Sequence, residues 1–249
     1  MHPRKANEMK HQKSIRLPKP AVDYRGFRLK RINEPRFRHL WYLLFWPIYW
    51  LRYPLIEAIN PPERCAVVGC IVDEWIPFNE WFLIPYMLWM VCMLAMVAYT
   101  LFYDVESFKK YSRFLILTFS ATTVIYLLWP TCQNLRPETF PRDNLMSRLV
   151  GLLYAADTST NVCPSEHVIG SLAVVAAAFH CPYFRKPLRL TLVTVLMVTV
   201  ALSTVFLKQH SILDVFAAIP LCIIVHFICF PIGKRKGKPA DFKERGLSM

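Results

Sequence analysis

Six apolar stretches constrain the fold of this chain more than any other feature. A helix needs about 20 apolar residues to cross the hydrocarbon core of a bilayer. Stretches of that kind, two of them somewhat short, occupy roughly residues 40–59, 81–103, 114–129, 165–179, 188–207 and 210–230. The sequence therefore predicts an all-α, polytopic membrane protein built as a bundle of six transmembrane helices.

The distribution of positive charge predicts the orientation of these helices. The chain carries a net charge of +13, although only 19% of its 249 residues are charged. Of its 30 Lys and Arg residues, 24 fall in four segments, which are residues 1–39, 104–113, 180–189 and 231–249. Because short cytoplasmic segments are enriched in Lys and Arg, we expect both termini in the cytoplasm. That arrangement requires an even number of spans.

Three regions follow from this topology. Residues 1–38 are expected to form a basic cytoplasmic segment, residues 39–230 the six-span domain, and residues 231–249 a basic cytoplasmic tail. Basic termini also occur in nucleic-acid-binding proteins, but here apolar spans adjoin them, so we expect membrane lipids and no nucleic acid as partners. No internal repeat supports a transporter or channel. The topology fits the plasma membrane of a bacterium, and an internal membrane with a lumenal site would fit equally.

The eight cysteines are dispersed and show no metal-binding pattern. No CxxC pair and no Cys/His ligand spacing occurs, so the sequence predicts neither a metal site nor a cofactor. Cys132 and Cys163 flank the long polar connection 130–164, and a disulfide between them is one option if that connection lies outside the cytoplasm.

Two segments carry candidate catalytic residues. His210 and Asp214 are four residues apart, so one helical face would hold both, and the carboxylate would orient the imidazole and make its other nitrogen more basic. Such a pair could also simply pack two helices together. Ser165, which follows Pro164, marks a helix start whose free N–H groups attract phosphate. His167 would lie in the first turn of that helix, placed to protonate a leaving group.

A third segment adds Arg136, whose planar guanidinium matches phosphate oxygens. The predicted topology puts all three segments on the outer face. Two His, an Asp, a helix N-terminus and an Arg on one face are the components of phosphoryl transfer through a phosphohistidine.

These segments resemble the type 2 phosphatidic acid phosphatase superfamily, which also contains the vanadium haloperoxidases. Its motifs are K-x6-R-P, P-S-G-H and S-R-x5-H-x3-D, in that order. The corresponding residues here are Trp129-x6-Arg136-Pro137, Pro164-Ser165-Glu166-His167 and Ser203-Thr204-x5-His210-x3-Asp214.

The resemblance implies a role for each matching residue. His210 would be the nucleophile, Asp214 would orient it, and His167 would protonate the leaving alkoxide. Arg136 and Ser165 would hold phosphate oxygens. The expected activity is that of a phosphatase for a membrane lipid phosphate, such as phosphatidic acid or a polyprenyl phosphate, acting without a cofactor at the extracytoplasmic face.

Three departures from the motifs leave other functions open. Trp129, Glu166 and Thr204 replace the motif Lys, Gly and Arg, and Glu166 adds negative charge where phosphate should bind unless it is paired. Substitutes for the missing cations could be Lys208, Arg142 or Arg148. The third motif is also similar to that of inositol phosphorylceramide and sphingomyelin synthases, which makes a lipid phosphotransferase an alternative. A catalytically weakened lipid-binding relative is another.

Overall fold

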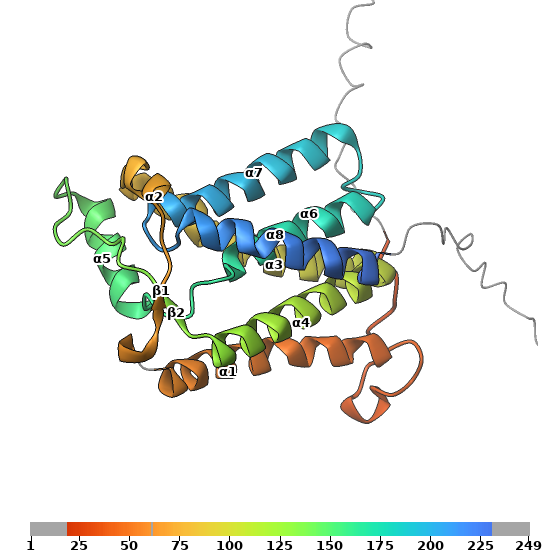
Figure 1. The fold of residues 1–249 in the computed structure, drawn as a ribbon. Helices are drawn as coiled ribbons and strands as arrows, with labels where there is room; N and C mark the ends of the chain where they lie inside the picture. Colours follow the sequence, from red (N-terminus) through yellow and green to blue (C-terminus); the bar gives the residue numbers. More distant parts are fainter. Residues whose placement is uncertain (1–18, 61, 231–249) are drawn as a thin grey trace, which may run out of the picture.

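The computed structural model describes residues 19–60 and 62–230 and is mostly helical. The predicted basic tail 231–249 and the first part of the basic N-terminal segment lie outside the described residues. The helical class that the sequence predicts is confirmed. The architecture is a bundle of long helices with a smaller set of short elements at one end (Figure 1).

Four helices are long and apolar enough to cross a membrane: α3 (Leu83–Tyr103), α4 (Val105–Leu128), α7 (Pro187–Phe206) and α8 (Ile212–Cys229). The other two predicted spans also form helices. They are α1 (Phe45–Ile59), which continues the 3-10 helix η2 (Arg38–Leu44), and α6 (Glu166–His180). Among the described residues, length and composition thus support four spans, and the count of six remains a prediction.

The short elements gather at one end of the bundle, on the left of Figure 1. They include the helices α2 (Ile71–Trp75) and α5 (Leu145–Ala156). Strands β1 (Ala66–Val67) and β2 (Thr131–Cys132) pair in parallel. The 3-10 turns η3 (Pro62–Arg64) and η4 (Glu80–Phe82) also lie at this end, whereas η1 (Leu29–Arg31) lies at the opposite end of the bundle.

Helix α6 is the centre of the bundle, since it packs against α3, α4, α7 and α8. Its buried face consists largely of small residues, such as Gly170, Ala173 and Ala177. Small side chains allow neighbouring helix backbones to approach closely in a membrane. The packing of α6 therefore fixes the position of its first turn, which carries His167.

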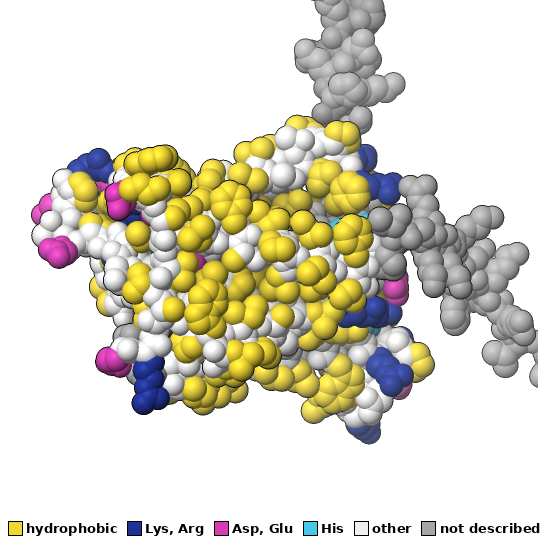
Figure 2. All heavy atoms as spheres, viewed as in Figure 1, with side chains coloured by type: hydrophobic (Ala, Val, Ile, Leu, Met, Phe, Trp, Pro, Cys, Tyr) yellow, Lys and Arg dark blue, Asp and Glu magenta, His cyan; other side chains and the backbone are white. Residues whose placement is uncertain are grey.

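The outer surface of the bundle is apolar. Figure 2 shows a broad band of hydrophobic side chains over the helices, with charged side chains concentrated towards the two ends. Large exposed side chains on α7 and α8 belong to this band, among them Leu192, Val195, Ile224 and Phe227. A soluble monomer rarely exposes so large an apolar surface, so the structure is that of an integral membrane protein.

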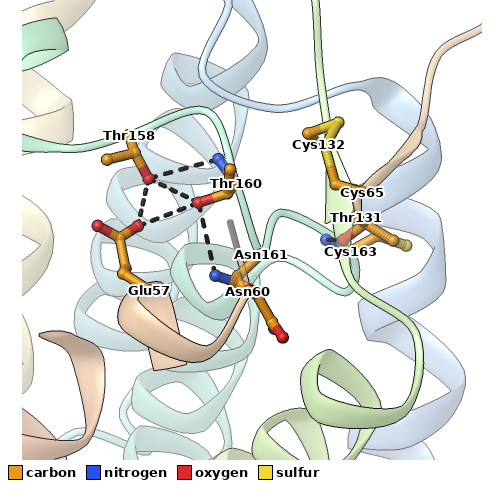
Figure 3. The surroundings of a disulfide bond; sticks show 9 residues. All are labelled: Glu57, Asn60, Cys65, Thr131, Cys132, Thr158, Thr160, Asn161 and Cys163. Atoms are coloured by element: carbon orange, nitrogen blue, oxygen red, sulfur yellow. Dashed lines mark hydrogen bonds between the residues drawn. A yellow bond between two sulfur atoms is a disulfide. The ribbon is translucent and has the colours of Figure 1, made fainter. Parts of the chain in front are cut away.

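A disulfide connects two of the short segments, but its pair of cysteines differs from the pair considered above in one member. Cys65 is bonded to Cys132, and Cys163 is a buried free thiol (Figure 3). The pairing of β1 with β2 causes this arrangement, because it brings the Cα atoms of Cys65 and Cys132 to 5.6 Å, a separation suited to a disulfide. The proposed Cys132–Cys163 disulfide is therefore wrong.

Candidate active site

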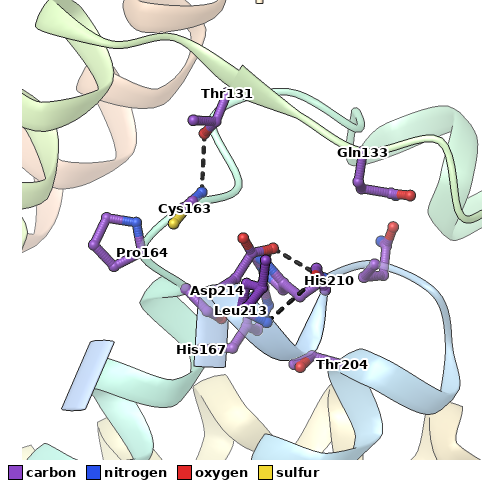
Figure 4. A network of polar contacts seen from close by, with 12 residues as sticks. Thr131, Gln133, Cys163, Pro164, His167, Thr204, His210, Leu213 and Asp214 are labelled. Atoms are coloured by element: carbon purple, nitrogen blue, oxygen red, sulfur yellow. Dashed lines mark hydrogen bonds and ion pairs between the residues drawn. The ribbon is translucent and has the colours of Figure 1, made fainter. Parts of the chain in front are cut away.

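His210 and Asp214 form the pair that the sequence predicts, although His210 lies just before α8. Ser211 is the N-cap of α8, and its backbone N–H donates to Asp214 Oδ2 at 3.0 Å. The same oxygen lies 3.1 Å from His210 Nδ1 (Figure 4). A capping interaction thus aims the carboxylate at the imidazole. Asp214 is fully buried, which strengthens its electrostatic effect on His210.

His167 lies directly opposite this pair. Its Nδ1 is 3.3 Å from His210 Nε2, so two imidazoles that are 43 residues apart meet at one point. The rings of Trp89 and Tyr86 pack against His167, with centroid distances of 4.3 and 4.6 Å. The two imidazoles are in direct contact.

The hydrogen-bond partners assign the protons on the two rings. An ionised Asp214 only accepts hydrogen bonds, so His210 Nδ1 must carry the proton that it shares with Asp214. In that tautomer the His210 Nε2 lone pair faces His167 Nδ1, 3.3 Å away, and a hydrogen on that Nδ1 would be the donor. The ring nitrogen with nucleophilic character therefore points at the group that the sequence suggests as the acid.

The start of α6 is coupled to the start of α8. Ser165 is the N-cap of α6, its Oγ accepts from the Val168 backbone N–H, and its own backbone N–H donates to the Asp214 carbonyl at 3.1 Å. Ser165 is completely buried. Its observed contribution is to hold the two histidine-bearing helix starts together.

Arg136 stabilises the wall of the site. Its guanidinium donates to the carbonyl oxygens of Tyr154 and Asp157 and to Gln209 Oε1, and it stacks on the Tyr154 ring. Burial lowers the pKa of Arg136, an effect that the Asp157 carboxylate opposes. These bonds occupy most of its donors, with Nε left without a partner among the described residues.

The three other candidate cations have different partners. The Lys208 ammonium donates to the carbonyl oxygens of Asp73 and Ile76. The Arg142 guanidinium forms a two-pronged ion pair with Glu80, and Arg148 pairs with Asp143 at the surface. None of the three lines the cavity described next. They do not replace the motif cations in this structure.

A cavity of about 420 Å³ opens beside the two histidines. His167 and His210 contribute to its wall together with Tyr53, Tyr86, Trp89 and Tyr126. Asp157 also lines it and accepts hydrogen bonds from Tyr53, Tyr86 and Gln209. The histidine contact thus lies at the edge of a largely aromatic chamber.

Glu166 is paired, which answers the charge problem that its sequence position raises. Arg52 of α1 donates to both carboxylate oxygens, Nη1 to Oε1 at 2.8 Å and Nη2 to Oε2 at 2.7 Å. Tyr49 and Thr122 donate to the same carboxylate. Arg52 is a cation in an apolar stretch, and such residues are usually functional; that signal could have identified it from the sequence.

A comparison with protein-family models bears on the identity of the chain. The model of the PAP2 superfamily matches residues 110–238, just over half of the chain. This chain belongs to the PAP2 superfamily. No curated protein and no solved structure matches it. PAP2 proteins are phosphatases or lipid phosphotransferases, so the family supports an enzyme in general terms.

The PAP2 match includes both histidines, Asp214 and Arg136, and it excludes Arg52 on α1. Within residues 19–60 and 62–230, no group of three or more His, Cys, Asp or Glu side chains is arranged to hold a metal ion.

Gly170 tests how strictly the PAP2 site depends on the packing of Trp89. A Cβ atom on Gly170 would lie 2.5 Å from Trp89 Nε1 and would also collide with Met93 Sδ. We expect Gly170→Ala to displace the Trp89 ring from His167 and to lower kcat by roughly 10- to 100-fold, since small misplacements of reacting groups are costly. Steady-state kinetics measure this loss.

The matched control is Gly151→Ala on α5. There the added Cβ would meet the Phe140 ring at 3.5 Å, an ordinary contact. Its kinetics should stay close to those of the unmodified protein. Equal losses in the two variants would show that the Trp89 contact is not what matters.

Proposed function

We propose that this protein is a lipid-phosphate phosphatase that works through a phosphohistidine on His210. The contact between His210 Nε2 and His167 Nδ1, backed by Asp214 and placed at the edge of a cavity, is the observation that carries the proposal. A nucleophile, its orienting carboxylate and an acid–base group are the minimum set for this type of covalent catalysis.

In the first step, a substrate phosphate separates the two imidazoles and His210 Nε2 attacks phosphorus. The bond between phosphorus and the lipid oxygen breaks, and the leaving oxygen takes a proton from a protonated His167. Asp214 stabilises the positive charge that develops on the His210 ring. The products of this step are a lipid alcohol and phosphohistidine.

In the second step, water attacks the phosphorus of the phosphohistidine. His167 accepts the proton of that water, the N–P bond breaks, and inorganic phosphate leaves. Neutral His210 and protonated His167 are restored, so the cycle balances. The net reaction is hydrolysis of one phosphate ester bond.

The extracytoplasmic face fits this proposal best. The connections α3–α4 and α6–α7 lie at one end of the bundle, and the disulfide with α2 and α5 lies at the other (Figure 1). Stable disulfides form mainly in oxidising compartments, and the basic connections favour the cytoplasm. His210 belongs to the disulfide end, because its neighbour Gln209 contacts Asp157 just after α5.

A lipid is the substrate that the surroundings favour. The cavity is large enough for a headgroup but not for acyl or polyprenyl chains, which would extend into the bilayer along the apolar surface of the helices. Phosphatidic acid and polyprenyl phosphates have this division between a phosphate headgroup and an apolar tail. We therefore place both among the candidate substrates.

A phosphotransferase is the second candidate, and the aromatic wall of the cavity favours it. Tyr49, Tyr53, Tyr86, Trp89 and Tyr126 leave room for an organic acceptor beside the histidines. Transfer requires the same phosphohistidine, with an alcohol in place of water in the second step. The two activities therefore differ only in the acceptor.

Phosphate release from phosphatidic acid and from a polyprenyl phosphate, measured on the full chain in detergent, tests the proposal. We expect phosphate release from both lipids, with water as the acceptor. We also expect inhibition by orthovanadate, which mimics pentacoordinate phosphorus. Formation of a new phosphodiester when a lipid alcohol is added would favour the transferase. Absence of release and of transfer from either lipid would contradict an enzyme and favour a lipid-binding role.

A further inference from the structure

The Arg52–Glu166 pair stands in the wall of the cavity without a part in the two-histidine mechanism. Both side chains line the cavity together with His167 and His210. Their side chains are only 14% and 11% exposed. A buried ion pair is weak evidence for added stability, because desolvation offsets most of the Coulomb attraction. Its position beside the proposed nucleophile raises the question of a functional role.

The hydrogen bonds of Arg52 leave the donors on one edge of its guanidinium without partners among the described residues. Nη1 donates to Glu166 Oε1, to Thr123 Oγ1 and to the Phe119 carbonyl, whereas Nη2 has Glu166 Oε2 as its only partner among the described residues. Nε has no partner there although it is buried. One Nη2–H and the Nε–H therefore remain, and these two donors form the side-on fork that matches two oxygens of a phosphate.

Two of the cations that the family motifs would supply are replaced in this chain. Trp129 occupies the motif Lys position and its side chain is exposed, and Thr204 occupies the motif Arg position and donates to the Ala201 carbonyl. Lys208 is bound to two backbone carbonyl oxygens. A phosphate in this cavity would meet Arg52 as the cation that lines the same wall as the histidines.

We infer that Arg52 binds an oxyanion of the substrate phosphate through its Nε/Nη2 edge, and that Glu166 is the positioning residue that holds it there. The inference rests on the proposed function. Glu166 accepts hydrogen bonds from Nη1 and Nη2, the end-on edge of the Arg52 guanidinium. The guanidinium stacks over the Tyr49 ring, which fixes its plane. Thr123 and the Phe119 carbonyl accept from Nη1 and fix its position. The side chain is thereby held in one orientation before a ligand arrives.

Two kinds of role for Arg52 are separable by a double variant. If Arg52 serves only to neutralise Glu166, then Arg52→Gln lowers activity because it leaves the buried Glu166 carboxylate without a cation. In that case Arg52→Gln/Glu166→Gln restores activity. If Arg52 binds phosphate, the double variant remains defective. Arg52→Lys keeps the positive charge and loses the fork, so it isolates the contribution of the two-pronged contact.

The measurements are KM, kcat and the inhibition constant for orthovanadate, with Arg148→Gln as an arginine control outside the cavity. We expect the double variant and Arg52→Lys to raise both KM and the vanadate constant about 10-fold or more, in line with the loss of charge-assisted hydrogen bonds. Glu166→Gln, which leaves the fork in place, should raise them less. Thermal unfolding of each variant identifies loss of folding.

The inference would be overturned if the double variant had the KM and the orthovanadate inhibition constant of the unmodified protein. Failure of the proposed function gives a different result, since the unmodified protein would then release no phosphate. In that case calorimetric binding of inorganic phosphate, compared between the unmodified protein and Arg52→Lys, still decides the inference. Equal affinity, or no binding to either, would contradict it.

Discussion

His210→Gln is expected to reduce phosphate release from a lipid phosphate by at least about 10³-fold, because removal of a covalent nucleophile leaves only weak residual catalysis. Glutamine is a polar side chain of similar size, so the change removes the nucleophilic nitrogen with little change in packing volume. The measurement is the initial rate of phosphate release in detergent, normalised to folded protein.

His226→Gln is the matched control for this variant. His226 lies near the end of α8, stacked on Phe230 and far along the helix from the site. Its substitution should leave the rate close to that of the unmodified protein. Retention of full activity by the His210 variant would refute a mechanism based on that residue.

Asp73→Ala is expected to produce the largest loss of stability. The Asp73 carboxylate is completely buried and joins α2 to α8, since it accepts from the backbone N–H groups of Cys70 and Ile212 and from the Ser211 hydroxyl. Its removal leaves three donors without this acceptor, of which the Ser211 hydroxyl is buried and the two N–H groups are partly buried. At about 1–3 kcal/mol for a buried unsatisfied group and less for partly buried ones, we expect a loss of about 2–3 kcal/mol.

Thermal unfolding in detergent measures this effect, and the rate of phosphate release should fall as well because Ser211 adjoins His210. Asp143→Ala provides the control, since Asp143 forms a surface ion pair with Arg148, and such pairs contribute little. Similar midpoints for the two variants would show that Asp73 does not hold the start of α8 in place.

The helices were predictable because the apolar interior of the lipid bilayer constrains the sequence of every segment that crosses it. A spanning segment must be apolar over its whole length, so the stretches that became α3, α7 and α8 are visible in the sequence. The convergence of His167 on His210 was also predictable, since both belong to short motifs whose order and spacing resemble those of a known superfamily. Local signals and a resemblance sufficed for these elements.

The partners of the charged residues were not predictable in the same way. Arg52 and Glu166 are 114 residues apart, and their contact depends on how α1 rotates against α6. The hydrogen bonds of the Lys208 ammonium depend on where the carbonyl groups of α2 and of the turn after it lie. The Cys65–Cys132 disulfide depends on the pairing of β1 with β2. Each of these contacts is determined by tertiary packing, which the hydrophobic periodicity of the sequence does not reveal.

Trapping the phosphorylated protein tests the central claim most directly. A lipid carrying radioactive phosphate is mixed with the enzyme, the reaction is quenched during turnover, and the labelled residue is located by peptide mass spectrometry. The account predicts an acid-labile, base-stable phosphate on His210 that is absent from the His210→Gln variant. Turnover without a labelled protein, or a label on another residue, would contradict it.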